Sequence, residues 1–176
     1  ARKIHVEASR MIQLVNDILQ LSNLDNVSEA GTPLTMETVD LLEVARECVE
    51  RQKVNAKRSF ISLTYLGESA PVLGSRSLLD ELCQNLCDNA IRYNRPGGKV
   101  QIITACTRDG HCSLTVKDNG IGIPKEAQSS VFERFYRVDK SRSKATGGTG
   151  LGLAIVKHIA RIHNARIKLE SEIGEG

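Results

Sequence analysis

Thr146–Ile162 reads TGGTGLGLAIVKHIARI, a glycine-rich turn that leads directly into an amphipathic helix. The glycines at 147, 148, 150 and 152 carry no side chain, so a ligand can approach the bare backbone there. The residues that follow repeat at helical spacing, and one face of the predicted helix carries Leu151, Ala154, Ile155, His158, Ile159 and Ile162.

The start of this predicted helix favours a bound anion. Its first amides have no partner inside the helix, and the helix dipole is positive at this end. The anion most often found in such a place is a phosphate, so we expect a phosphate cradle. A flexible loop that leads into an ordinary core helix is the alternative, and this stretch alone leaves it open.

The stretch departs from three other phosphate-binding patterns. No Lys-Thr or Lys-Ser pair follows the glycines, as a P-loop requires. The spacing Gly148-x-Gly150-x-Gly152 differs from the dinucleotide fingerprint G-x-G-x-x-G. The sequence also lacks the His-Arg-Asp and Asp-Phe-Gly motifs of protein kinases. A nucleotide bound here would therefore be held by another design.

Length and composition limit the class of protein. The 176 residues suggest one domain and a little more, and a hydrophobic fraction of 40% is that of an ordinary globular protein. The net charge of +3 is too small to predict nucleic acid as a partner. No apolar run approaches the ~18 residues of a membrane span, and the charged start is unlike a signal peptide.

The five cysteines form no C-x-x-C pair, and no histidine has the spacing of a zinc ligand to them. We therefore expect reduced, buried thiols in a cytosolic protein and no zinc site.

The periodicity of the rest predicts helices and strands without strict alternation, which favours an α+β fold, a two-layer sandwich. Asp40 and Glu43 form a predicted capping box, Ser77 a predicted helix cap, and Asp109-Gly110 a hairpin turn. Polar, turn-rich residues at 24–33 suggest a boundary, and residues 124–149 suggest a long mobile loop. The expected helices are 1–24, 41–57, 78–93 and 151–163. The expected strands are 34–39, 60–66, 100–107, 112–117 and 165–172, and residues 71–74 are expected to form a brief extended piece.

The expected helix over 78–93 carries an unusual polar face. Asn85, Asn89, Arg92 and Tyr93 follow one another along it, although asparagine is a weak helix former. An amide oxygen suits Mg²⁺ that already holds phosphate oxygens, an arginine can neutralise phosphates, and a tyrosine can pack on a base. A solvated helix face is the alternative.

Asp118 ends an expected strand and opens the turn Asp-Asn-Gly-Ile-Gly-Ile, residues 118–123. Its carboxylate only accepts hydrogen bonds, so it can bind an exocyclic amine such as that of adenine. An ordinary β-turn with a surface aspartate is the alternative. Farther on, residues 131–137 (VFERFYR) hold three of the six aromatic residues inside a polar region, which suggests a lid anchor or a contact with another protein.

Taken together and in this order, these segments resemble the catalytic ATP-binding domain of bacterial sensor histidine kinases. The resemblance covers about residues 35–176 and implies a Bergerat-type fold, in which a mixed sheet packs on three helices. The four segments match that family's asparagine box, first glycine box, phenylalanine box and second glycine box, and they are Asn85–Tyr93, Asp118–Gly122, Phe132–Arg137 and Gly147–His158.

The resemblance assigns a role to each matched residue. Asn89 matches the asparagine that binds Mg²⁺, and Asn85 matches the asparagine one turn earlier. Arg92 stands where the family usually has a lysine near the phosphates, which keeps the charge and changes the geometry. Tyr93 matches the aromatic that packs on adenine, and Asp118 the aspartate that binds the adenine amine. Asp118 is thus expected to bind and not to catalyse.

The remaining matches lie in turns. Arg137 matches the lid arginine near the terminal phosphate, and with Asn89 we count it as catalytic. The adenine pocket is expected to be shaped by Gly120, Gly122 and Ile123, and the backbone around the phosphates by Gly148, Thr149, Gly150, Leu151 and Gly152.

The resemblance also implies a domain organisation. Residues 1–26 look like the second helix of the dimerisation hairpin, and residues 27–176 like the catalytic domain without its last strand. His5 lacks the acidic residue and proline of a phosphoacceptor box, so we expect a fragment that does not phosphorylate itself. The implied partners are ATP, Mg²⁺, the acceptor histidine helix of the parent kinase, a response regulator and a second copy. The implied place is the cytoplasmic part of a membrane-anchored parent.

Two other functions stay open at this point. An ATP-driven conformational clamp would need a glutamate base, for which Glu81 is the candidate, and a nucleotide-binding interaction module would need no catalysis. Asp88, beside Asn89, is a further candidate for accepting a proton.

Overall fold

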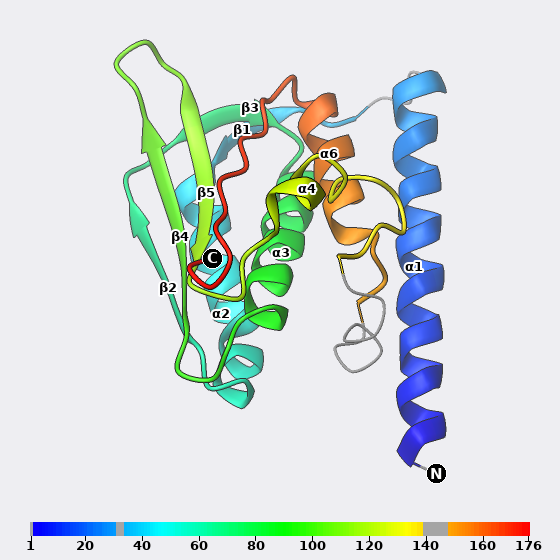
Figure 1. The fold of residues 1–176 in the computed structure, drawn as a ribbon. Helices are drawn as coiled ribbons and strands as arrows, with labels where there is room; N and C mark the ends of the chain where they lie inside the picture. Colours follow the sequence, from blue (N-terminus) through cyan, green and yellow to red (C-terminus); the bar gives the residue numbers. More distant parts are fainter. Residues whose placement is uncertain (1, 31–33, 139–147) are drawn as a thin grey trace.

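The computed structural model describes residues 2–30, 34–138 and 148–176 (Figure 1). In chain order the elements are α1 (Arg2–Ala30), β1 (Glu37–Asp40), α2 (Leu41–Arg58), β2 (Ser62–Gly67), β3 (Pro71–Gly74), α3 (Arg76–Arg92), β4 (Lys99–Cys106), β5 (Cys112–Asp118), α4 (Lys125–Gln128) and α6 (Gly152–Ile162).

The strands form two sheets. In the larger one the order is β2-β4-β5, with β2 parallel to β4 and β4 antiparallel to β5. The smaller sheet pairs β1 with β3 antiparallel. Asp118 pairs with Val100 at the end of β5, so the sheet carries this carboxylate to its edge, where the predicted adenine turn begins.

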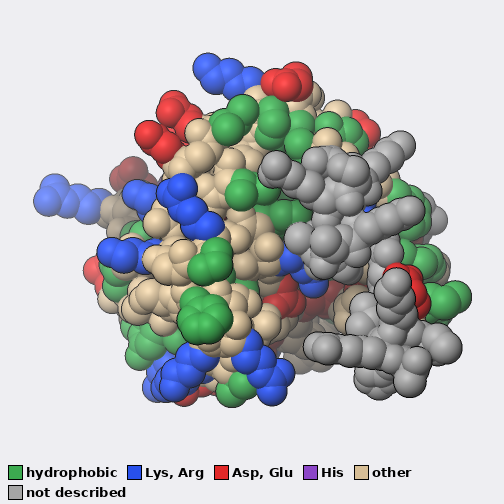
Figure 2. All heavy atoms as spheres, turned by 60° about the horizontal axis from the view of Figure 1, so that its bottom comes forward, with side chains coloured by type: hydrophobic (Ala, Val, Ile, Leu, Met, Phe, Trp, Pro, Cys, Tyr) green, Lys and Arg blue, Asp and Glu red, His purple; other side chains and the backbone are tan. Residues whose placement is uncertain are grey.

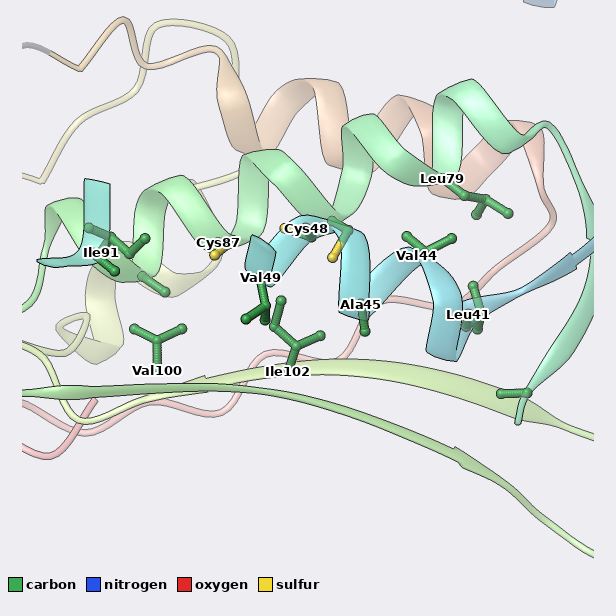
Figure 3. Close-up of a cluster of buried hydrophobic side chains, with 14 of the residues drawn as sticks. Leu41, Val44, Ala45, Cys48, Val49, Leu79, Cys87, Ile91, Val100 and Ile102 are labelled. Atoms are coloured by element: carbon green, nitrogen blue, oxygen red, sulfur yellow. The ribbon is translucent and has the colours of Figure 1, made fainter. Parts of the chain in front are cut away.

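Helices α2 and α3 cover one face of the larger sheet, as Figure 3 shows. Successive residues of a strand point to opposite faces, and Val100, Ile102 and Thr104 of β4 are the ones that point inward and are buried. The apolar face of α2 repeats at three and four residues and meets them through Val44, Ala45, Cys48 and Val49. This core is the expected two-layer α+β sandwich with a mixed sheet.

A second apolar core joins α6 to α1 and α3. Leu151, Ile155 and Ile159 are fully buried against Leu21 and Leu24 of α1. Figure 1 shows α1 running alongside α6, on the side of the molecule away from the sheet. The opposite side of α1 leaves an apolar row in solvent, which consists of Met11, Ile12, Val15, Ile18 and Leu19. None of the helices in the described ranges has both the length and the apolar content to cross a bilayer.

Helix starts follow from local hydrogen bonds. The Asp40 carboxylate accepts a bond from the Leu42 amide at 2.9 Å and caps α2 as expected. Helix α3 departs from the prediction, because it begins at Arg76 and its cap position is Ser75, which makes no side-chain cap bond. Ser77 therefore lies inside the first turn, with its hydroxyl 3.1 Å from that of Ser75.

The predicted strand over 165–172 was wrong. These residues run beside β5 in Figure 1, but no strand is formed there. Polar groups of Ser171 bond to the turn after β5 and to α4: Ser171 Oγ accepts from the Ile123 amide, and the Ser171 carbonyl accepts from Gln128 Nε2. Apolar residues alternate along this segment as in a strand, but its backbone does not form the hydrogen-bond ladder of a sheet.

Two further predictions need correction. Helix α1 continues to Ala30, beyond the end that was predicted for it at residue 24, while the division into domains after residue 26 stays a prediction. The expectation of five reduced cysteines was wrong for Cys106 and Cys112, which form a disulfide across the β4–β5 hairpin. Cys48, Cys83 and Cys87 are free and buried, as expected. The predicted loop over 124–149 includes the short helix α4, and its residues 139–147 lie outside the described ranges.

Candidate nucleotide site

Three predicted site residues meet at Gly148: Arg92 and Arg137, both expected near phosphate, and Tyr93, expected at adenine. A Cβ added to Gly148 would lie 2.9 Å from Tyr93 Oη, 3.2 Å from Arg92 Nη1 and 3.6 Å from Arg137 Nη2. The asparagine box and the phenylalanine box are far apart in sequence. Their last residues, Tyr93 and Arg137, nevertheless lie together beside Gly148. Two guanidinium groups and a phenol thus surround this glycine and give it a cationic environment.

The asparagines of α3 face the start of α6. A Cβ added to Gly152 would lie 3.1 Å from Asn85 Oδ1 and 3.6 Å from Asn89 Nδ2. Asn85 Nδ2 donates to the Glu81 carbonyl at 3.0 Å, which turns its amide oxygen toward α6. The polar face predicted for this helix thus packs against the start of α6 and the end of the glycine-rich loop.

The turn after β5 is fixed by the carboxylate that opens it. Asp118 Oδ1 accepts a bond from the Gly120 amide at 2.8 Å, while burial raises the pKa of the Asp118 carboxyl above its ordinary value. Gly120 packs against the Tyr93 carbonyl, since an added Cβ would come within 2.5 Å of it. Asp118 and Tyr93, which the family resemblance predicts to contact adenine, therefore both contact Gly120 in the same turn.

Gly122 and Ile123 continue this turn along the C-terminal segment. Gly122 has a φ of +71°, and a side chain there would collide with the Glu172 carbonyl. The Ile123 amide donates to Ser171 Oγ at 2.8 Å. These two residues hold the turn in place, and Ile123 is half-buried.

The phenylalanine box is tied to the glycine-rich loop through the backbone. The Phe135 amide donates to the Gly150 carbonyl at 2.9 Å, and both residues have positive φ, +64° and +75°. Positive φ is costly for phenylalanine, so the surrounding contacts must hold it. The Phe135 ring is 58% exposed, which leaves an aromatic surface beside the site. Gly147 lies outside the described residues.

The side chains of Thr149 and Leu151 face α1 and the second core. Leu151 is fully buried in the second core, and its amide donates to Thr149 Oγ1 at 3.3 Å. The Thr149 hydroxyl in turn donates to Asp17 of α1 at 2.6 Å. Sequence reasoning missed Asp17, because an aspartate within a helical stripe gives no signal of a partner 132 residues away.

Asp88 and Glu81, the two candidate proton acceptors, interact with side chains of other helices. Gln52 of α2 donates a hydrogen bond to Asp88, so this carboxylate faces the core between α2 and α3. Glu81 interacts with Gln20 of α1, and burial raises the pKa of its carboxyl. Neither arrangement favours a role in attack on a phosphate.

The lower end of the molecule carries both signs of charge on its surface. In Figure 2, Lys and Arg side chains appear at many points of the lower end of the molecule, with Asp and Glu side chains among them. A separate hollow of about 290 Å³ lies between the Phe132–Arg134 turn and α6, and none of the predicted site residues lines it.

Comparison with known proteins identifies the family. The sequence model of the family described as "Histidine kinase-, DNA gyrase B-, and HSP90-like ATPase" matches residues 74–176. The chain is 43% identical over 180 residues to the sensor-like histidine kinase SenX3 of Mycolicibacterium smegmatis, across all of this chain and 45% of SenX3. It therefore spans less than half the length of that relative.

Two solved structures are similar in fold. The mycobacterial sensor histidine kinase MprB is 36% identical, with a TM-score of 0.63 over 74% of this chain and 81% of that one. Full-length ShkA in complex with AMPPNP is 25% identical, with a TM-score of 0.80 over 96% of this chain and 35% of that one. The chain belongs to the histidine kinase-, DNA gyrase B- and HSP90-like ATPase family and carries the catalytic ATPase domain of a two-component sensor histidine kinase.

Proposed function

We propose that this domain binds ATP with Mg²⁺ between α3 and the glycine-rich loop and directs the γ-phosphoryl group to a histidine on another helix of the parent kinase, for relay to the aspartate of a response regulator. The convergence of Arg92, Tyr93 and Arg137 on Gly148 is the observation that carries this proposal. Phosphoryl transfer asks a protein mainly for positioning and for stabilisation of charge, and this arrangement offers both.

In this proposal Asp118 accepts a hydrogen bond from the adenine amine, and Tyr93 packs on the base. The amide oxygen of Asn89 is a ligand for Mg²⁺, which would neutralise phosphate charge when bound. Within the described ranges, no group of three or more His, Cys, Asp or Glu side chains is placed to hold a metal. A magnesium ion at Asn89 would thus depend on phosphate oxygens, so its binding should require nucleotide.

The acceptor histidine is proposed to lie outside this chain. His158 is 3.3 Å from Asp25 through Nε2, and His163 accepts a bond from the Ser75 amide at 3.0 Å, so both are engaged in structural contacts. A neutral imidazole has a free lone pair and needs no strong base to attack a phosphate. This agrees with a site in which Asp88 is engaged by Gln52 and Glu81 by Gln20.

The exposed apolar row on α1 supports a homodimer. Met11, Val15 and Ile18 are 68%, 53% and 42% exposed, although they repeat at the spacing of a coiled-coil seam. In the full parent, a second copy and the other helix of the hairpin would cover them. We place the domain in the cytoplasm beneath a membrane-anchored sensor, by its likeness to sensor kinases.

A titration with a fluorescent ATP analogue tests the site. Wild type, Asn89→Ala and Asp118→Ala are compared with and without Mg²⁺. Wild type should bind, Asp118→Ala should lose affinity in both conditions, and Asn89→Ala should lose mainly the contribution of Mg²⁺. Equal affinity in all three proteins would refute the assignment. Asp109→Ala, at the exposed hairpin turn, is the control for loss of a carboxylate.

A further inference from the structure

Asn119 follows the last residue of β5 and completes the pairing of this strand with β4. Its amide donates to the Lys99 carbonyl at 3.3 Å, as in a regular antiparallel pair. The return bond is different, because the Lys99 amide donates to the side-chain oxygen Oδ1 of Asn119, at 2.6 Å, where a regular pair would use the main-chain carbonyl. In this last pair of β4 and β5, a side chain therefore takes the place of the backbone.

The bond to the side chain leaves the peptide between residues 119 and 120 free to turn. The carbonyl of Asn119 and the amide of Gly120 belong to this one planar peptide, so they point in opposite directions. In the structure the Gly120 amide donates to Asp118 Oδ1 at 2.8 Å. If the Asn119 carbonyl turned toward the Lys99 amide, the same peptide would carry the Gly120 amide away from the carboxylate. The side chain of Asn119 thus permits the bond that holds Asp118.

The direction of the Asp118 carboxylate depends on this turn. Among the described residues, the bond from the Gly120 amide is the one hydrogen bond that the carboxylate accepts. Gly120 is itself buried against the Tyr93 carbonyl, which limits where its amide can lie. Asn119 is half-buried with its Oδ1 bound to the backbone of β4, so its effect on a ligand would pass through Asp118.

We propose that Asn119 is a positioning residue of the adenine pocket: by binding the Lys99 amide with its side chain, it ends β5 directly after Asp118 and directs the Asp118 carboxylate at the exocyclic amine of the base. The proposal rests on the adenine role given to Asp118 under the proposed function. It adds that recognition of the base depends on a side chain that acts through its neighbour and not on the nucleotide itself.

The first test compares the affinities of the whole 176-residue chain for ATP, ITP and tripolyphosphate, each with Mg²⁺, by calorimetry. ITP carries a carbonyl oxygen where adenine carries the amine, so the ratio of the ATP and ITP affinities reports on Asp118. Asn119→Ala removes the acceptor for the Lys99 amide and should lower this ratio by about 3- to 10-fold, the effect of one hydrogen bond. The affinity for tripolyphosphate, which has no base, should not change.

Two variants serve as controls. Asn119→Asp keeps an oxygen for the Lys99 amide, and its added charge acts on both nucleotides alike, so it should keep the wild-type ratio. Ser113→Ala removes a side-chain bond to the Ala105 carbonyl at the other end of the same strand pair and should also keep it. The proposal would be overturned by an unchanged ratio in Asn119→Ala, by an equal loss of affinity for all three ligands, or by an Asn119→Asp protein that behaves like Asn119→Ala.

A double-variant cycle separates this proposal from the adenine assignment. If Asn119 acts through Asp118, Asn119→Ala should leave the ratio unchanged in an Asp118→Ala background, and a further fall would overturn the proposal. A wild-type ratio in Asp118→Ala alone would refute the adenine role of Asp118, and the proposal with it. A ratio that falls in Asp118→Ala but not in Asn119→Ala would refute the role of Asn119 and leave the proposed function intact.

Amide exchange without nucleotide tests the structural step. The Gly120 amide, followed by NMR, should exchange faster in Asn119→Ala than in wild type, because its bond to Asp118 depends on the acceptor at position 119. In Asn119→Asp it should exchange at the wild-type rate. Exchange at Gly120 that is the same in Asn119→Ala and wild type would contradict the proposal.

Discussion

The amide oxygen of Asn85 faces the bare Cα of Gly152, and an added Cβ at position 152 would lie only 3.1 Å from it. Gly152 is the first residue of α6, where alanine is the better helix former. We therefore expect Gly152→Ala to lower nucleotide affinity by about tenfold, since it displaces Asn85, while the free energy of unfolding stays equal or rises by up to ~1 kcal/mol.

Affinity is measured by titration and stability by urea unfolding. Gly110→Ala is the matched control, because Gly110 has a φ of +80° and open space around it. That control should lose about 1 kcal/mol of stability and keep its affinity. A Gly152→Ala protein that binds nucleotide normally would show that the contact between α3 and the start of α6 is not part of the phosphate site.

Asp118→Asn should separate binding from stability. Burial raises the pKa of Asp118, so the ionised carboxylate at pH 7 costs folding free energy, and this cost disappears below the ordinary value of 3.8. Asparagine keeps an oxygen for the Gly120 amide and carries no charge. The variant should therefore melt higher than wild type at pH 7 but not at pH 3.

The same variant should lose its preference for adenine. A carboxylate repels the O6 acceptor of guanine, whereas an asparagine amide can donate to it. ATP and GTP affinities should thus move closer together. A preference for ATP that persists unchanged in Asp118→Asn would show that another group reads the base.

Asp40 should make the free energy of unfolding depend on pH in the sense opposite to that of Asp118. Bonds from the Ala70 amide and the Ser69 hydroxyl, and then from Leu42, lower the pKa of its carboxyl below 3.8 in the folded state. Its stabilisation is complete above the unfolded value and is lost as the pH falls through the lowered one. Asp40→Ala should cost about 1–2 kcal/mol at pH 7 and clearly less at pH 3, as urea unfolding at both values would show.

Asp40→Asn provides the control, because it keeps one acceptor for the amides but cannot titrate. It should destabilise less than Asp40→Ala at pH 7. If the cost of Asp40→Ala is the same at both pH values, the carboxylate is not the source of the stabilisation.

The disulfide between Cys106 and Cys112 should be detectable by alkylation. The two cysteines lie six residues apart with a Cα separation of 4.1 Å, and closing so short a loop stabilises the folded state by about 2 kcal/mol. Under non-reducing, denaturing conditions iodoacetamide should label only Cys48, Cys83 and Cys87. Dithiothreitol should lower the free energy of unfolding of wild type and leave Cys106→Ser/Cys112→Ser unchanged. Labelling of all five cysteines would contradict the bond.

The sequence predicted the elements that depend on neighbours along the chain. Helix α2 came from its apolar repeat and the Asp40 cap, and the β4–β5 hairpin came from alternation around Asp109-Gly110. The polar face of α3 and its proximity to the glycine-rich loop came from residue types together with a family resemblance. The assigned roles in binding remain predictions that the experiments above test.

What the sequence did not predict depends on partners far away in the chain. Residues 165–172 alternate like a strand, but a strand needs a neighbour, and their polar groups bond to Ile123 and Gln128. The hydrogen bond between Asp17 and Thr149 joins residues that are 132 positions apart, and neither residue type predicts such a partner. Two serines stand two positions apart at the start of α3, so propensity alone could not choose between Ser75 and Ser77 as the cap.

The pairing of β2 with β4 bears on the order of folding. The β4–β5 hairpin joins residues that are close in sequence, whereas the parallel register of Ser62 with Lys99 can close only after β3 and α3 have been placed between them. Closing the larger loop costs more chain entropy, so the hairpin is expected in the folding transition state and β2 later. Substitutions in the hairpin should then slow refolding, and substitutions in β2 should mainly speed unfolding, which stopped-flow kinetics can measure.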